Sequence, residues 1–408
     1  MDKKTKVSSY GLPAQAGRRI TNDEVFKLIE REEEYQKKTI RLIPSENFVS
    51  EEVKEALGSD LTNKYAEGYP GKRYYQGNKI VDEIENLAIE RGKKLFGVEH
   101  LNVQPYSGSP ANSAVLMALV EPREKICGMK LSAGGHLTHG HPKITFSGKF
   151  FNSVQYDVDS EGRIDYEKLR ELVVAEKPKL IWAGTTAYPW ILDWKRFSKI
   201  ADEVGAWLVA DISHIAGLIV GGAHPSPVPD VHIITSTTHK SLRGPRGAII
   251  GITKKGISFA EGLGILDLPK LIDRAVFPGL QGGPHMNSIA AMAVAFEEAN
   301  GEDFKNYAQQ VVNNAKVLAE TLKKEGLKVF GTENHLMVVD VGLGMGKEIA
   351  VRLEEAGIIV NANTIPHDEA GPFKPSGIRI GTPAMTTRGY VESDFEALGV
   401  KIAEIIKG

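Results

Sequence analysis

The sequence predicts an α/β fold with a mostly parallel sheet, and two observations support this prediction. Between residues 61 and 290, short apolar runs alternate with amphipathic stretches, and the clearest runs are residues 179–184 (KLIWAG), 207–211 (WLVAD) and 232–236 (HIITS). Such alternation is typical of strands joined by crossover helices. Reactive polar side chains follow two of these runs, at strand ends where open sheets of this class bind their ligands.

The other elements are predicted from local signals in chain order. A charged helix is expected from the polar residues 21–24 through Lys38, because side chains of this kind cap helix N-termini. After Pro284 the pattern is helical over residues 287–325. A shorter α+β portion follows, with a strand at residues 336–341 (LMVVDV).

Composition describes an ordinary globular chain of 408 residues, 42% hydrophobic and 25% charged. A formal net charge of −2 gives no field that would attract nucleic acid or an anionic membrane. Cys127 is the single cysteine, so an intramolecular disulfide is excluded and a reducing cytoplasm is expected. Neither the apolar stretch of a signal peptide nor a run long enough to span a membrane is expected.

Lys240 is the first candidate for chemistry, in the segment 233–247 (IITSTTHKSLRGPRG). A β-branched apolar run predicts a buried strand that delivers this lysine into a loop. A buried lysine near another cation has a lowered pKa and becomes a nucleophile for aldehydes, and Arg243 or Arg246 could be that cation. The alternative is a solvated lysine in a basic turn.

Asp211 ends the neighbouring apolar run, and its carboxylate suits the ring nitrogen of pyridoxal phosphate. A protonated pyridinium is the better electron sink, so the nitrogen needs an acid partner. His214 lies three residues on and can reach the same side. A metal site of the Asp-x-x-His type without an evident third ligand, and a simple capped turn, are the alternatives.

Ser107, Gly108 and Ser109 precede an apolar helical pattern that starts near Ala111. The free N–H groups of a helix N-terminus bind phosphate, although such residues also serve as ordinary helix caps. Together with an aldehyde-binding lysine and a pyridinium acid, these residues predict the phosphate cup of the same cofactor.

At this point the chain resembles the serine hydroxymethyltransferase (glycine hydroxymethyltransferase) family over nearly its whole length. The matching stretches are SENF (45–48), LTNKYAEGYPGKRYYQG (61–77), NVQPYSGSPAN (102–112), GGHLTHG (134–140), DISHIAGL (211–218), TTHKSLRGPRG (237–247), VFPGLQGGP (276–284), NANTIP (361–366) and SGIRIGTPAMTTRG (376–389). The resemblance implies the aspartate-aminotransferase-like fold type I of transferases that depend on pyridoxal phosphate. It implies an N-terminal arm (1–60), a large cofactor domain (61–290) and a small C-terminal domain (291–408).

The resemblance also implies which residues hold the cofactor. Lys240 would bind the aldehyde as a Schiff base, Asp211 would pair with the ring nitrogen, and His136 would stack on the ring. Further contacts would come from Ser107, Gly108, Ser109, Thr186, His214 and His239, and from Tyr65, Gly282 and Gly283 of a neighbouring subunit. A metal site of His136, His139 and His141 is the alternative, but no cysteine or carboxylate accompanies them, and we predict no metal.

Arg379 is the predicted clamp for the substrate carboxylate, because its planar guanidinium matches a carboxylate with two hydrogen bonds. A surface ion pair is the alternative, but the flanking Ile378 and Ile380 argue against exposure. As the resemblance implies, Ser45, Tyr65, Glu67 and Tyr75 would also contact the amino acid, and Glu67, Tyr74, Gly135, Leu137 and Asn363 would contact the folate.

Glu67 is the acid expected to move a proton at a serine hydroxyl or a folate nitrogen, which a partly buried glutamate can do. A helix-surface charge is the alternative, although the adjoining GYPG is turn-forming. The predicted catalytic set is Lys240, Glu67, His136, Asp211 and Tyr75.

Some positions depart from the family's usual pattern without touching the predicted chemistry. Pro44 replaces the usual alanine before SEN and stiffens the loop. Ala362 stands where a lysine is common near the folate, so a modified pterin stays open beside tetrahydrofolate. The segment 253–274 is longer than usual, and one helix follows TTRG before Gly408.

The prediction for function is reversible conversion of L-serine and tetrahydrofolate into glycine and 5,10-methylenetetrahydrofolate, with pyridoxal phosphate as cofactor. A homodimer or a dimer of dimers is expected, without membrane or nucleic-acid partners. The alternative on the same cofactor is a folate-independent aldolase of threonine and other β-hydroxy amino acids, against which Glu67, Tyr74 and Asn363 argue. A third possibility is an inactive relative with a binding role, against which intact Lys240, Asp211 and Arg379 argue.

Overall fold

The structure, a computed structural model, describes residues 23–408, and the described residues divide into two compact units, one that ends at Ile40 and one that comprises residues 41–408. The first unit contains helix α1 (Glu24–Lys38), whose first turn is capped by the carboxylate of Asp23. This confirms the predicted charged helix, while the first two residues of its predicted start lie outside the described residues.

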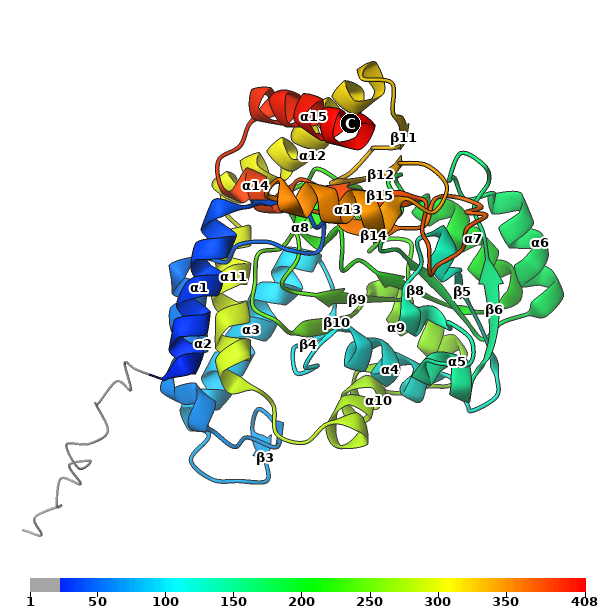
Figure 1. The fold of residues 1–408 in the computed structure, drawn as a ribbon. Helices are drawn as coiled ribbons and strands as arrows, with labels where there is room; N and C mark the ends of the chain where they lie inside the picture. Colours follow the sequence, from blue (N-terminus) through cyan, green and yellow to red (C-terminus); the bar gives the residue numbers. More distant parts are fainter. Residues whose placement is uncertain (1–22) are drawn as a thin grey trace, which may run out of the picture. The chain divides into compact units, whose positions relative to one another are not determined.

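A seven-stranded sheet forms the centre of the second unit (Figure 1). Its strands in spatial order are β4 (His100–Asn102), β10 (Ala248–Ile252), β9 (Ile233–Thr237), β8 (Trp207–Asp211), β7 (Leu180–Gly184), β5 (Lys125–Met129) and β6 (Asn152–Tyr156). The strands from β9 to β6 run parallel, whereas β10 is antiparallel to both β9 and β4. The predicted mostly parallel sheet is thus confirmed.

Both faces of this sheet are buried, which explains the continuous apolar runs in the sequence. Ile181 and Ala183 of β7 belong to the core on one face, and Leu180 and Trp182 belong to the core on the other. Successive side chains of a strand point to opposite faces, so each position in such a strand must be apolar or small.

Helices pack on both faces of the sheet and connect its strands. One core combines sheet residues with α3, α6, α7, α8, α11 and α12, and the other combines them with α4, α9, α10 and η4. The bounds of the helices up to β11 are α2 (Glu51–Leu57), η1 (Asp60–Asn63), α3 (Lys79–Phe96), α4 (Gly108–Leu119), η2 (Leu131–Ala133), η3 (Leu137–His139), α5 (Phe146–Phe150), α6 (Tyr166–Glu176), α7 (Trp194–Val204), α8 (Ala216–Val220), α9 (Lys254–Gly262), α10 (Leu268–Arg274), η4 (Ala275–Leu280), α11 (Met286–Ala299) and α12 (Glu302–Lys324).

A smaller antiparallel sheet follows in the order β11 (Lys328–Phe330), β12 (Leu336–Asp340), β15 (Gly377–Gly381) and β14 (Asn361–Asn363). Helices α12 and α13 pack against this sheet, and α15 packs on these two helices (Figure 1). The remaining elements are β1 (Ile40–Arg41), the hairpin strands β2 (Gly68–Tyr69) and β3 (Lys72–Arg73), α13 (Gly346–Glu355), β13 (Ile358–Ile359), α14 (Pro383–Thr387) and α15 (Glu392–Lys407).

The predicted strands agree with the structure to within one residue at each end, but one predicted helix start was wrong. Helix α4 begins at Gly108 rather than near Ala111, because Ser107 takes the N-cap position and a proline is tolerated in a first turn. The helical pattern predicted over residues 287–325 is confirmed and consists of two helices that are separated at Asn300 and Gly301.

The boundaries expected at residues 60 and 290 stay predictions. Within residues 23–408, no helix combines the length and the apolar character needed to cross a membrane.

Candidate active site

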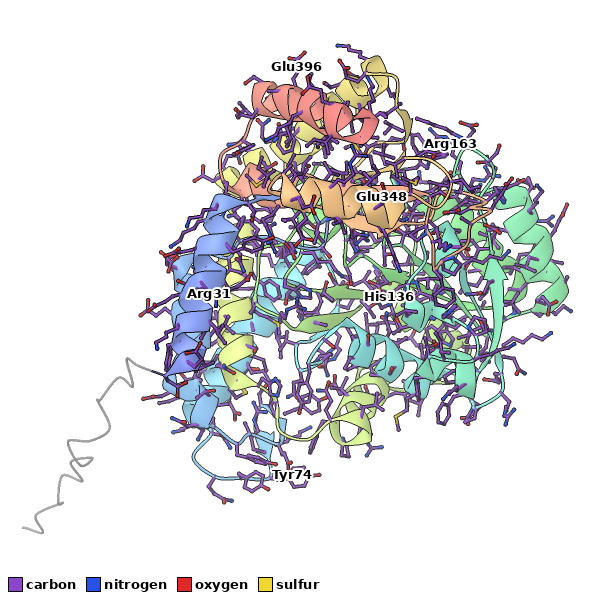
Figure 2. The ribbon with its side chains drawn as sticks, in the orientation of Figure 1. Arg31, Tyr74, His136, Arg163, Glu348 and Glu396 are labelled. Carbon is purple, nitrogen blue, oxygen red and sulfur yellow. The ribbon has the colours of Figure 1, made fainter. Side chains whose placement is uncertain are left out.

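A cavity of about 260 Å³ lies at the carboxyl ends of the central strands, beside the start of α4. It brings together predicted cofactor residues that are far apart in the sequence. Those that line it are Ser107, Gly108, Ser109, His136, Thr186, Asp211, His214, His239 and Lys240. In Figure 2 the labelled His136 lies in the middle of the molecule, at the level of the central sheet.

Lys240 follows β9 by three residues, and its side chain lies partly buried in this cavity. Burial lowers the pKa of Lys240 to about 8; the negative charge of Asp211 opposes this shift, and the positive charges of Arg379 and Arg246 add to it. A sizeable fraction of this amine is therefore neutral near pH 8, as attack on an aldehyde requires.

Asp211 is a buried carboxylate at the end of β8. Its hydrogen-bond donors are Asn112 Nδ2 (2.8 Å), His139 Nε2 (3.0 Å), Ser213 N (3.1 Å) and Ser213 Oγ (2.6 Å). Burial alone would raise the pKa of Asp211, but the hydrogen bond and charge of His139, with His136 and Lys240, hold it well below its ordinary value. An ionised carboxylate thus faces the cavity, as a protonated ring nitrogen requires.

His136 and His139 lie beside this carboxylate, with ring centroids 5.5 Å apart. Burial and the neighbouring His139 lower the pKa of His136 to about 4, so its imidazole is neutral and suited to stack on an aromatic cofactor. His139 stacks on Trp182, with centroids 5.0 Å apart and ring planes at 10°.

The metal site considered for His136, His139 and His141 is not the group that the structure assembles. Among the described residues, ligand atoms of His136, His139 and Asp211 lie within 4.8 Å of one another. His136 and Asp211 of this trio line the cavity, and His139 is joined to Asp211 by a hydrogen bond, so the trio is part of the cavity described above.

The start of α4 fits a phosphate group. Ser107 is the N-cap residue, yet its hydroxyl makes no capping hydrogen bond. A Cβ on Gly108 would lie 2.8 Å from the methyl group of Thr237, so only glycine leaves room there. Thr237 Oγ1 and His239 Nδ1, both buried at the cavity, have no hydrogen-bond partner among the described residues. Free N–H groups and hydroxyls at a helix N-terminus are an anion site.

His214 also lines the cavity, and its Nδ1 lies 3.3 Å from Nε2 of the buried His335. Burial holds the pKa of His214 well below its ordinary value and lowers that of His335 to about 3. Both rings are therefore neutral, so His214 can donate or accept one hydrogen bond toward the cavity.

Arg379 reaches from β15 of the smaller sheet to the cavity wall. Its Nη1 donates to the carbonyl of Thr186 (2.5 Å) and its Nε donates to Asn361 Oδ1 (3.0 Å). Burial lowers its pKa to about 10, far above neutrality, so the guanidinium keeps its charge. The flanking Ile378 and Ile380 are 0% exposed, which confirms that this segment is not at the surface.

Ser45 lies near the end of the same strand, although it does not line the cavity. Pro44 packs so closely on Gly381 that a Cβ there would approach it to 2.6 Å. The departure from the family pattern at Pro44 is thus a packing contact two residues beyond Arg379.

Tyr65, Glu67, Tyr75, Gly282 and Gly283 form a second group that does not line the Lys240 cavity. The rings of Tyr65 and Tyr75 meet edge to face with centroids 5.2 Å apart. The charge of Glu67 and its hydrogen bond with Tyr65 raise the pKa of that phenol. A Cβ on Gly282 would lie 3.2 Å from Glu67 Oε1, and one on Gly283 would lie 3.6 Å from the Tyr65 ring. All five were predicted as site residues, and the structure places them next to one another.

The four residues predicted to contact the pterin do not lie together, because Tyr74 is far from the other three. Tyr74 is 69% exposed and, in Figure 2, lies at the edge of the molecule away from His136. Gly135 lies next to the cavity, where its carbonyl accepts a hydrogen bond from Thr186 Oγ1 (3.0 Å). Leu137 is 42% exposed. Asn363 lines a small pocket together with Gly134, the residue before Gly135.

Some site residues were missed from the sequence. Asn112, on α4, accepts a hydrogen bond from Thr235 Oγ1 (2.7 Å) and donates to Asp211, and its only signal in the sequence is a polar residue in an apolar helix.

Of the two arginines proposed to lower the pKa of Lys240, the structure supports Arg246; Arg243 instead lies over the Tyr307 ring, 4.7 Å from its centroid.

Comparison with known proteins agrees with this arrangement of residues. The model of a protein family described as serine hydroxymethyltransferase matches residues 19–402. A serine hydroxymethyltransferase from Desulfotalea psychrophila is 52% identical over 387 residues, which cover 94% of this chain and 88% of that protein.

The lysine assignment predicts selective labelling. Pyridoxal phosphate followed by borohydride should label Lys240, at a rate that rises with pH and levels off above about pH 8, because the neutral amine is then in the majority. Peptide mapping by mass spectrometry locates the label. The Lys240→Arg variant should lose it, and the exposed-site control Lys254→Arg should keep it. A label elsewhere in wild-type protein contradicts the assignment.

Proposed function

Because this chain belongs to the serine hydroxymethyltransferase family, we propose that it converts L-serine and tetrahydrofolate reversibly into glycine and 5,10-methylenetetrahydrofolate. Pyridoxal phosphate is the proposed cofactor. The observation that most supports the proposal is the pairing of a partly buried lysine, whose pKa is lowered to about 8, with an ionised buried aspartate in one cavity. That pairing meets the two needs of this cofactor, a nucleophilic amine and an anion at its ring nitrogen.

The proposed roles of the cavity residues follow from their geometry. When bound, pyridoxal phosphate supplies an electron sink for the substrate's α-carbon. Lys240 would hold its aldehyde, the residues at the start of α4 would hold its phosphate, and Asp211 would keep its ring nitrogen protonated. The neutral imidazole of His136 would stack on the ring, and His214 would offer it a hydrogen bond.

Arg379 is proposed to hold the substrate carboxylate. Its Nη2 makes no hydrogen bond within the described part of the chain, while Nε and Nη1 fix the guanidinium to Asn361 and Thr186. A guanidinium held in this way is already oriented for a carboxylate, which lowers the entropic cost of binding. Ser45 and Tyr75 are proposed to complete the amino-acid contacts.

Glu67 is proposed to exchange a proton with the serine hydroxyl through its Oε atoms. Tyr65 bonds to this carboxylate and Gly282 leaves it room, so the group is held but not enclosed. Tyr74, Gly135, Leu137 and Asn363 are proposed to bind the pterin.

We further propose that the site is shared between two subunits of a homodimer. Lys240 and Glu67 are both needed, yet Glu67, Tyr65 and Gly282 lie outside the cavity of their own chain. A second copy would bring that group to the first copy's cavity. We also propose that the chain consists of an N-terminal arm (1–60), a large domain (61–290) and a small domain (291–408). A cytoplasmic location is proposed as well.

The reaction itself tests the proposal. Purified protein loaded with pyridoxal phosphate should form glycine from serine rapidly with tetrahydrofolate and far more slowly without it. Equal rates with and without folate, together with rapid cleavage of threonine, would favour the folate-independent aldolase instead.

Glu67→Gln should keep cofactor and glycine binding but lose about 10²–10⁴-fold in folate-dependent serine cleavage, because an amide preserves the shape of the side chain but cannot exchange the proton. Steady-state kinetics and glycine titration check this. Turnover near the wild-type value removes Glu67 from the mechanism.

Arg379→Ala should weaken binding of serine and glycine by about 2–5 kcal/mol while the cofactor stays bound, since a charge-assisted pair in a desolvated pocket is lost. Calorimetric titration measures the loss. Arg170→Ala, which removes an exposed pair with Glu203, is the control and should leave amino-acid affinity unchanged. Unchanged affinity in Arg379→Ala contradicts the proposed clamp.

Mixing inactive Lys240→Ala subunits with inactive Tyr65→Ala subunits should restore activity. In a mixed dimer with shared sites, one site carries both lesions and the other carries neither, so up to about half of the wild-type activity per mixed dimer is expected. Absence of recovery after demonstrated subunit exchange would mean that Tyr65 acts within its own chain.

A further inference from the structure

The backbone around Glu67 is held by one buried guanidinium. Arg73, on β3, has a side chain that is 3% exposed, and its Nη1 donates to the carbonyls of Ala66 and Gly68, both at 2.8 Å. The carbonyl of Glu67 itself accepts the N–H of Tyr74 (3.0 Å). The three consecutive carbonyls centred on Glu67 are therefore all fixed by hydrogen bonds.

A buried acid holds the guanidinium in turn. Arg73 Nη2 donates to Glu85 Oε2 (2.5 Å), and Arg73 Nε donates to Asp82 Oδ1 (2.9 Å), both acids lying on α3. The Glu85 side chain is only 1% exposed. A planar guanidinium with several fixed acceptors has one orientation, so α3 determines where the hairpin places Glu67.

Gln104 joins the same network from the strand β4 side. Its Nε2 donates to Glu85 Oε1 (2.7 Å) and to the carbonyl of Gly68 (3.0 Å). Its own carbonyl accepts Gln281 Nε2 (2.9 Å), and Gln281 is the residue before Gly282, the neighbour of the Glu67 carboxylate. Both sides of Glu67 are thus tied to one set of buried hydrogen bonds.

We propose that Glu85 and Gln104 are positioning residues for Glu67, acting through Arg73 and the Gly68 carbonyl on the carboxylate that exchanges the proton. This inference rests on the proposed function. A buried ion pair is weak evidence for a contribution to stability. Here each partner also bonds to the backbone that carries the acid, and a shift of about 1 Å at a reacting group can cost about 10²-fold in rate.

Glu85→Gln is the main test, because it removes the charge that orients Arg73 with little change of shape. We expect kcat for folate-dependent serine cleavage to fall about 10- to 100-fold, with glycine affinity unchanged. Glu83→Gln, an exposed acid on the same helix, is the matched control and should behave as wild type. Hydrogen exchange of the peptide spanning residues 66–75 should accelerate in Glu85→Gln and not in Glu83→Gln.

A double-mutant cycle separates positioning from a general structural role. If Glu85 acts through Glu67, Glu85→Gln should cost almost nothing further in a Glu67→Gln background. The same fold loss in both backgrounds, or unchanged kcat and exchange in Glu85→Gln, overturns the proposal.

Gln104→Met is the second variant, for the case that Glu85→Gln does not fold. It is neutral, of similar size, and leaves the Arg73–Glu85 pair in place, so a loss of about 3- to 10-fold in kcat with faster exchange at residues 66–75 is expected. Wild-type kinetics in this variant would count against the network. The proposed function is tested separately, on the wild-type protein. If that protein is inactive with serine and tetrahydrofolate, the proposed function is refuted, whatever the variants do.

Discussion

The site depends on keeping the Asp211 carboxylate ionised while it is buried. Burial works against the charge, and hydrogen bonds from Asn112, His139 and Ser213 offset that cost. These donors come from α4, from the turn η3 and from the residues after β8, so the carboxylate can be satisfied only when the sheet and its helices are assembled. A single charge thereby links the fold to the chemistry proposed for it.

The other charged groups follow from this one. Lys240 shares the cavity with Asp211, whose charge favours the protonated amine, yet its pKa is lowered to about 8, mainly by burial and further by the positive charges of Arg379 and Arg246. His136 and His214 are kept neutral by burial. The cavity therefore combines the Asp211 anion, the reactive amine of Lys240, the Arg246 guanidinium and uncharged imidazole rings, a combination suited to a cofactor that carries its own phosphate and ring charge.

Much of this arrangement was predictable from the sequence, for physical reasons. The β-branched and apolar runs determined the strands, and strand ends of a parallel sheet converge, so Lys240 and Asp211 could be expected together. Asn112 and His139 were not predicted as partners of Asp211, since they are separated from it by 99 and 72 residues and no local pattern marks such a contact.

Arg243 and Arg246 could not be told apart from the sequence. The positive φ of Arg243 (58°) accompanies a guanidinium that lies over the Tyr307 ring, and only the folded chain shows this. The separation of Glu67 and Tyr65 from the Lys240 cavity also required the structure, although the resemblance had assigned Tyr65 to a neighbouring subunit.

The protonation state of the bound cofactor tests the central claim most directly. Nitrogen-15 NMR of pyridoxal phosphate labelled at its ring nitrogen, bound to the protein near pH 7.5, should give the chemical shift of a protonated pyridinium. The Asp211→Asn variant, which keeps the shape but not the charge, should give that of a neutral pyridine. A neutral ring nitrogen in the wild-type protein would contradict the claim that Asp211 is the ionised partner on which the site depends.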